Sequence, residues 1–281
     1  MLYDGFLFRR DKDDFLVECD EQVGIDLFYH LQQHKLRAKV RLADLSKDFR
    51  VEAWWNLPSL LDGPELTITD PRGALGLLRS IAPRAEAADG MIAVDVKWYD
   101  LLRYAAGIAE GPLEMRRLQA IPLEYNLDWL GAVAFDKGCY LGQELMARTH
   151  FRGTIRKRLL PFKILADAGA DAGGDCQQAF QVRPEGVEGI PSGAELYAVS
   201  PPEARSMSQV QAMEVEGQAL GKVVSSLGNV GLAVIRLPSW TPGHRFAVHR
   251  PTPGASDQRQ FLLVEPYKPH WWPRLDPNDL Q

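Results

Sequence analysis

Apolar and polar positions follow two different periods in the first part of the chain. Leu2–Phe8 and Phe15–Cys19 are short, apolar-rich segments on either side of the charged residues 9–14, which predicts a β-hairpin. From Glu21 to Lys35 the apolar positions recur every four residues, which predicts an amphipathic helix with Asp20 as its cap. The recurring apolar residues are Val23, Leu27 and Leu31.

The same pattern predicts further strands and helices up to residue 109. Strands are expected at Lys39–Ala43, Phe49–Trp55 and Leu66–Thr69, and the order of elements predicts a mostly antiparallel sheet with a helix on one face. A short helix is expected at Ala74–Ile81. A longer one is expected at Val94–Ala109 and is ended by glycines and a proline. The apolar side of the longer helix is predicted to hold Trp98, Leu101, Leu102 and Ala105.

The second half of the chain reads as short strands separated by glycine and proline. This spacing predicts a small β-barrel, after a strand at Leu159–Leu165 and a surface insertion near residues 166–190. The other expected strands are Glu195–Val199, Gln209–Val215, Ala219–Ser225, Val230–Ile235 and Phe261–Val264. The sequence therefore predicts an α+β protein of two domains, residues 1–157 with an antiparallel sheet and helices and residues 158–281 with the barrel.

Composition narrows the classes of protein that fit. The chain has 281 residues, of which 46% are hydrophobic, and its 32 basic and 37 acidic residues give a net charge of −5. This balance argues against general binding to nucleic acid, and no apolar run approaches the length that spans a bilayer. The three cysteines are far apart and have no metal-like spacing, which argues against a disulfide framework or a zinc site within the chain.

Reactive groups concentrate in residues 137–144, which read KGCYLGQE. Gly138 and Gly142 allow positive φ or a close approach to a ligand. Cys139 follows Lys137 by two residues, a cationic setting that favours the thiolate. Cys139 and Lys137 are therefore the candidate catalytic residues. The alternative is that Cys139 is a small buried hydrophobic residue.

Several other polar residues are candidates for binding. The segment 145–164 contains no acid, so the cations in its first part are expected to attract an anionic ligand or partner; from residue 148 to residue 158 they are Arg148, Arg152, Arg156, Lys157 and Arg158. Glu124 is either a ligand-binding carboxylate or a cap. His30 and His34 have the i,i+4 spacing of a metal pair, but no third ligand at helical spacing accompanies them, so a non-metal role is favoured.

The KGCYLGQE segment resembles the signature of the YgfZ-type proteins, which are relatives of the glycine-cleavage T-protein, an aminomethyltransferase. Mitochondrial iron-sulfur cluster assembly members are the most similar in this respect. The likeness continues in the same order over most of the chain, through residues 70–72, 98–100, 103–111, 121–127, 148–158 and 221–233.

This resemblance implies a T-protein-like folate-binding domain followed by a β-barrel, and a role in maturing [4Fe-4S] proteins in the mitochondrial matrix with A-type scaffold partners. Because a cluster usually needs four ligands, Cys139 would be a ligand shared with a partner or a group that reacts with a bound intermediate. Tetrahydrofolate or a related folate is the implied cofactor. The residues implied to bind it are Asp4, Glu124, Gly138, Tyr140, Gly142, Gln143, Glu144 and Arg148.

Two further functions remain open at this point. One is a tetrahydrofolate-dependent aminomethyl or one-carbon transferase, in which Asp4 and Glu124 orient the cofactor. The other is a protein-docking module, in which the barrel and the basic run form an interface and the ancestral cavity has lost its function. The family pattern also has several dozen residues ahead of the position of Met1, which predicts that the present chain lacks the first part of its domain.

Overall fold

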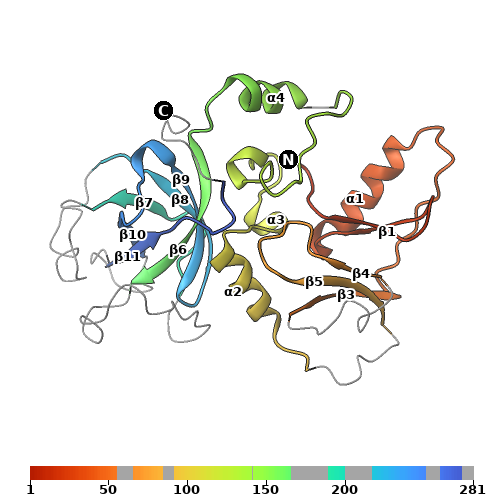
Figure 1. Ribbon diagram of the computed structural model, residues 1–281, viewed down its shortest axis with the longest axis horizontal. Helices are drawn as coiled ribbons and strands as arrows, with labels where there is room; N and C mark the ends of the chain where they lie inside the picture. The colour runs from red at the N-terminus through yellow and green to blue at the C-terminus, as the bar shows by residue number, and fades with distance from the viewer. Residues whose placement is uncertain are drawn as a thin grey trace. The chain divides into compact units, whose positions relative to one another are not determined.

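The computed structural model describes residues 1–55, 66–84, 92–140, 142–165, 189–199, 217–250 and 260–273. The chain divides into two compact units, which interleave in sequence. Unit 1 contains residues 1–94 and 110–121, and unit 2 contains residues 95–109 and 122–281 (Figure 1). The expected domain boundary at residue 157 stays a prediction.

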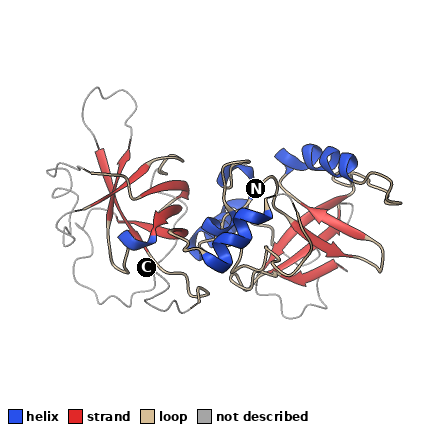
Figure 2. Ribbon diagram, turned by 90° about the horizontal axis from the view of Figure 1, so that it is seen from above, coloured by secondary structure: helices blue, strands red, loops and turns tan. Residues whose placement is uncertain are grey.

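Unit 1 begins with the predicted hairpin. Strands β1 (Phe6–Arg9) and β2 (Phe15–Glu18) pair antiparallel, and helix α1 (Glu21–His34) follows. The Asp20 side chain accepts a hydrogen bond of 2.8 Å from the backbone N–H of Gln22, so it caps α1 as expected. Figure 2 shows α1 lying along one side of the strands of this unit, as in Figure 1.

A second, three-stranded antiparallel sheet lies in unit 1. Its order is β3 (Phe49–Trp54), β5 (Leu78–Pro83) and β4 (Leu66–Thr69), so β5 is the central strand. A hydrophobic cluster in this unit contains buried residues of the hairpin and of β5, with the partly buried Phe49, Leu66 and Ile68 packed against them; its buried members are Phe8, Leu16 and Ile81. The short helix α3 (Gly111–Glu114) completes the unit's elements.

Two predictions for unit 1 are wrong. The helix expected at Ala74–Ile81 is a turn followed by strand β5, because Gly76 adopts a positive φ of 61° and the next residues pair with strands on both sides. The strand expected at Lys39–Ala43 is an irregular, mostly exposed segment, since no neighbouring strand in the described residues pairs with it.

Unit 2 contains the predicted barrel. Six strands of the described chain close it in the order β10-β11-β6-β9-β8-β7. Their bounds are β6 Lys157–Leu165, β7 Glu195–Ala198, β8 Gly221–Leu227, β9 Val230–Arg236, β10 Phe246–Arg250 and β11 Gln260–Pro266. Strand β10 was not predicted. The insertion expected near 166–190 and the strand expected at 209–215 lie largely or wholly outside the described residues.

The barrel interior is filled by large apolar side chains. Phe162, Leu196 and Phe246 are among its fully buried residues. Gly231 of β9 faces the ring of Phe162, and a Cβ at this position would overlap that ring. The absence of a side chain at Gly231 therefore makes room for the aromatic core.

Helix α2 (Val96–Ala106) belongs to unit 2 and is tied to the barrel and to the segment after it. The Tyr104 hydroxyl lies 2.7 Å from the Ser225 hydroxyl, and the Trp271 indole donates 2.7 Å to the Ala106 carbonyl. The helix prediction is confirmed, but its apolar side is only partly right. Leu101 is buried, whereas Trp98 and Leu102 are exposed. The remaining short elements are η2 (Pro122–Tyr125), α4 (Gln143–Arg152) and η3 (Leu237–Ser239).

Candidate functional site

The candidate thiol lies on an exposed loop directly ahead of α4. Cys139 is a free, exposed cysteine, so the alternative of a buried hydrophobic residue is wrong. The Lys137 ammonium lies 4.8 Å from the centre of the Tyr140 ring, so these two residues form a cation–π pair. In the sequence, Lys137 precedes the thiol of Cys139 and Tyr140 follows it. A nucleophile or cluster ligand needs this accessibility.

The start of α4 is shaped by Gly142. Its φ of 86° lies in the left-handed region, whereas Gly138 has no such φ, so the special backbone conformation is needed at one of the two glycines. The Gln143 N–H donates 3.2 Å to the Tyr140 carbonyl, which closes the turn. Glu144 stands in the first turn of α4, where a negative charge interacts favourably with the helix dipole.

The basic run after Glu144 divides into exposed and buried members. Arg148, Arg152, Arg156 and Lys157 are exposed. Arg158 is only 3% exposed, so the expectation that the whole run is free to attract an anion is wrong for this residue.

Arg158 instead holds the segment that carries Glu124. Its guanidinium donates 2.6 Å and 3.0 Å to the two carboxylate oxygens of Asp128, lies 3.5 Å from the centre of the Trp129 ring, and donates 2.8 Å to the Leu123 carbonyl. Bidentate pairing and stacking on an aromatic face are characteristic of arginine. Arg158 therefore anchors η2 to the first strand of the barrel.

The two candidate cofactor carboxylates lie in different units, and both are half-buried. In unit 2, burial raises the pKa of Glu124, and the nearby Lys157 opposes this shift. In unit 1, burial raises the pKa of Asp4, although a hydrogen bond of 2.9 Å from the Gly111 N–H opposes it. Both groups therefore take up a proton at a higher pH than an exposed carboxyl group does.

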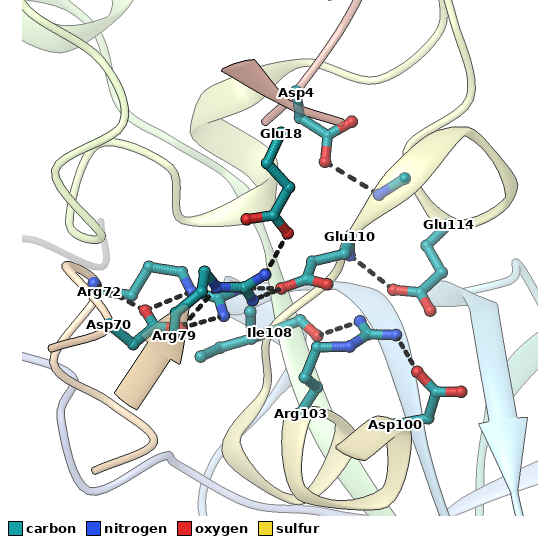
Figure 3. Close-up of polar contacts among 11 residues, drawn as sticks. Asp4, Glu18, Asp70, Arg72, Arg79, Asp100, Arg103, Ile108, Glu110 and Glu114 are labelled. Carbon is teal, nitrogen blue, oxygen red and sulfur yellow. Dashed lines mark hydrogen bonds and ion pairs between the residues drawn. The ribbon is translucent and has the colours of Figure 1, made fainter. Parts of the chain in front are cut away.

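Unit 1 also contains a buried ion cluster that the sequence did not reveal. The Arg72 guanidinium donates 2.9 Å and 2.6 Å to the two carboxylate oxygens of Asp70, and it also pairs with Glu110. Arg79 pairs with Glu18, lies 3.2 Å from a Glu110 oxygen and 3.6 Å from an Asp70 oxygen (Figure 3). The cluster thus joins β2, β5 and the segment before α3.

Neither spacing nor pattern could have identified this ion cluster. Residues 70–72 carry part of the family likeness, which does not indicate ion pairing. Arg79 lay inside a segment expected to be helical, and its partner Glu18 is 61 positions away. Both guanidinium groups also lie over the Phe6 ring, at 4.9 Å for Arg72 and 4.1 Å for Arg79.

The His30–His34 pair shows no metal-site geometry. The two rings are 4.1 Å apart, and His34 Nδ1 lies 2.8 Å from the His30 carbonyl. Within the described residues, no group of three or more His, Cys, Asp or Glu side chains is placed to hold a metal ion. In the same part of the chain, no helix has both the length and the hydrophobicity that crossing a membrane requires.

Comparison with known proteins matches both the barrel and most of the chain. The family model described as "CAF17, C-terminal beta-barrel domain" matches residues 156–274. A Mycosarcoma maydis protein named "Iron-sulfur cluster assembly factor IBA57 homolog, mitochondrial" is 33% identical over 298 residues, which cover 99% of this chain and 72% of the relative. The mouse protein "Iron-sulfur cluster assembly factor IBA57, mitochondrial" is 31% identical over 97% of this chain and 69% of its own length.

Other relatives are longer than the matched part. The Pyricularia oryzae homologue of the same name is 33% identical over 86% of this chain, and the match spans 60% of that relative. Among solved structures, the glycine cleavage system aminomethyltransferase T from Bartonella henselae matches with a TM-score of 0.55 over 97% of this chain and 72% of its own. Its sequence identity is 15%, so this likeness confirms the expected T-protein-like fold and nothing more.

Proposed function

The chain belongs to the family of iron-sulfur cluster assembly factors named IBA57, and from this premise we propose that it supports the maturation of mitochondrial [4Fe-4S] proteins. The observation that carries the proposal is the match to the Mycosarcoma maydis factor over 99% of the chain. We place the protein in the mitochondrial matrix, where its cluster-building partners would be A-type scaffold proteins. The relatives' names support the mitochondrial part of this assignment.

In this role Cys139 supplies one thiolate to a cluster that a partner holds with its own cysteines. Its exposure on the loop before α4 supports this part of the proposal, because a shared ligand must reach a second protein. One thiolate is too few for a cluster, which usually has four ligands. The iron-sulfur cluster is therefore cargo, bound for a time at a site that Cys139 and the partner's cysteines form together.

The residues close to Cys139 in the sequence have supporting roles in this proposed function. Lys137 provides a positive charge two positions ahead of Cys139 in the sequence. Gln143 and Glu144, at the start of α4, orient the partner or ligand, and Arg148 attracts an anionic group. Gly138 and Gly142 let the backbone approach the bound group closely, and Tyr140 offers its ring to that group.

Asp4 and Glu124 are proposed to orient a folate of the tetrahydrofolate type. Asp4 Oδ2 accepts the Gly111 N–H, and a carboxylate has further lone pairs that can accept a hydrogen bond from a ligand N–H group. Glu124 is half-buried and has no hydrogen-bond partner in the described part of the chain. Acceptors of this kind suit the amino-bearing rings of a folate, which supplies a one-carbon carrier where it is bound.

The deciding experiment is anaerobic co-purification with an A-type scaffold protein. We expect the wild type and the scaffold together to show visible-range cluster absorbance, and Cys139→Ala to lose most of it. Cys19→Ala is the control, because Cys19 is a half-buried thiol of unit 1 that has no proposed part. Equal absorbance with Cys139→Ala would overturn the role of this thiol.

A folate-dependent aminomethyltransferase is the alternative function, and the T-protein-like fold favours it. That chemistry depends on the two carboxylates and needs no thiol. Transfer of a one-carbon unit to tetrahydrofolate at a useful rate, unchanged in Cys139→Ala and lost in Asp4→Asn, would replace the assembly function. Full maturation activity of Cys139→Ser in cells would instead support a docking module.

A further inference from the structure

One face of α4 is exposed and carries both apolar and positive side chains. Met146 is the buried residue of this helix. Since each residue turns an α-helix by 100°, the opposite side holds Leu145, Arg148, Phe151 and Arg152, together with Glu144. Leu145 is 49% exposed and Phe151 is 67% exposed.

Among the described residues, the cations of this region form no ion pair with an acidic side chain, and the one electrostatic contact that they make is that of Lys157 with Glu124. The cations are Arg148, Arg152, Arg156 and Lys157, and all four are exposed. Only Glu144 opposes them on the exposed face of the helix. The local field is therefore positive on a protein whose net charge is −5.

Aromatic packing supports the exposed Phe151. The His150 ring stacks on Phe135 with centroids 3.8 Å apart and planes 10° apart. Phe151 meets His150 edge-on at 4.8 Å and Phe135 at 5.8 Å. These contacts orient an apolar side chain that remains largely in solvent, and such side chains are typical anchors of protein interfaces.

We propose that this face, formed by Leu145, Arg148, Phe151 and Arg152 with the adjoining Arg156 and Lys157, docks an acidic protein surface that also presents apolar side chains. The positive charge of this face favours a partner whose surface is acidic. The overall negative charge disfavours a nucleic acid, and two large apolar side chains on a ten-residue helix give little area for a membrane.

The proposal rests on the proposed function and gives its partner a place to bind. Cys139 precedes Gln143, the first residue of α4, by four positions. A chain of four residues spans at most about 14 Å, so the thiol lies at the border of the docking face. A scaffold protein bound to α4 would thus hold its own cysteines near Cys139.

Binding of an apo A-type scaffold protein to the full chain, measured by calorimetry at two salt concentrations, tests this inference. We expect Arg152→Glu/Arg156→Glu to weaken binding about tenfold or more at low salt, and less at high salt. The control is Arg37→Glu/Arg41→Glu, which reverses two exposed arginines of unit 1 and changes the net charge equally. Phe151→Ser should weaken binding at both salt concentrations, whereas Leu36→Ser, at an 84% exposed position, should not.

The outcomes separate this inference from the proposed function. If the wild type binds the scaffold and the α4 variants bind it equally well, the docking face is wrong and the assembly function stands. If the folded wild type does not bind the scaffold, both the partner assignment and the docking face fail. Tighter binding of the α4 face to heparin or to phosphatidylserine vesicles than to the scaffold would overturn the choice of a protein partner.

Discussion

Glu18 shows how a single buried carboxyl group responds to the ion cluster around it. The cluster contains the carboxylates of Glu18, Asp70 and Glu110 against the guanidinium groups of Arg72 and Arg79, so one negative charge is in excess. Glu18 Oε2 is buried and has no hydrogen-bond partner among the residues that the structure describes. Burial raises the pKa of Glu18 to about 7, although Arg79 opposes this shift.

This gives a prediction for stability against pH. In the folded state Glu18 keeps its proton from its ordinary pKa of 4.5 up to about 7, whereas the unfolded chain has released it. The free energy of unfolding should therefore fall as pH rises from 4.5 to 7, by at most about 3 kcal/mol from this group, and then level off. Urea unfolding of the wild type and of Glu18→Gln between pH 5 and 8 measures the difference.

Comparison of the two proteins isolates the Glu18 contribution, since Asp4 and Glu124 also have raised pKa values and remain in both. Glu21→Gln, at an exposed position in the first turn of α1, is the matched control and should keep the wild-type dependence. A Glu18→Gln protein whose stability falls as steeply as that of the wild type would contradict the assignment.

At the scale of elements, the way helix α2 ends depends on Gly107, the residue that directly follows it. Gly107 has a φ of 75°, and a Cβ there would lie 2.9 Å from Pro161 and 3.0 Å from Pro269. Gly131 has nearly the same φ of 71°, but a Cβ at that position would have no atom within 4 Å. The two positions therefore share the backbone strain of an L-residue and differ in crowding.

We predict that Gly131→Ala lowers the free energy of unfolding by about 1 kcal/mol and that Gly107→Ala lowers it by about 2 to 3 kcal/mol. The smaller effect reflects the left-handed conformation, and the excess reflects the two prolines that must move. Chemical denaturation of both variants provides the comparison. Equal losses would mean that the prolines shift without cost.

The elements also show what the sequence can and cannot predict. Local signals were sufficient to predict the hairpin, α1 with its Asp20 cap, and most barrel strands, because periodicity and helix caps depend on residues that are close in the sequence. They failed at Ala74–Ile81, where the apolar residues have a pattern that suits either a helix or a strand. Pairing of β5 with β3 and β4 decides that choice, and those partners are distant in the chain.

The candidate site divides in the same way. Cys139 stood out because a thiol, a lysine and two glycines occur within a few residues, and its exposure agrees with a functional role. The buried position of Arg158 was not predictable, since an arginine in a basic run gives no local sign of a carboxylate 30 residues earlier. Long-range ion pairs of this kind become visible only when the fold brings their members together.

At the scale of the whole molecule, the two units differ in whether their sheets have edge strands that pair on one side only. Each barrel strand of unit 2 pairs on both sides, and β9 contains Leu232, Ala233 and Ile235, which are fully buried. In unit 1 the β1–β2 pair is a two-stranded sheet, and a hairpin of this size is marginally stable without packing against other elements. Its stability depends on the contacts of Phe8 and Leu16 with the core.

We therefore predict unequal hydrogen exchange along the native chain. Amides of β6 and β9 should exchange slowest, through global opening of the barrel, and those of β1 and β2 should exchange faster, through local opening of the hairpin. Within unit 1 the central strand β5 should be better protected than the hairpin, because it pairs on both sides. Native-state exchange followed by mass spectrometry resolves these segments, and protection of β1 and β2 equal to that of β9 would show that the hairpin opens only with the entire protein.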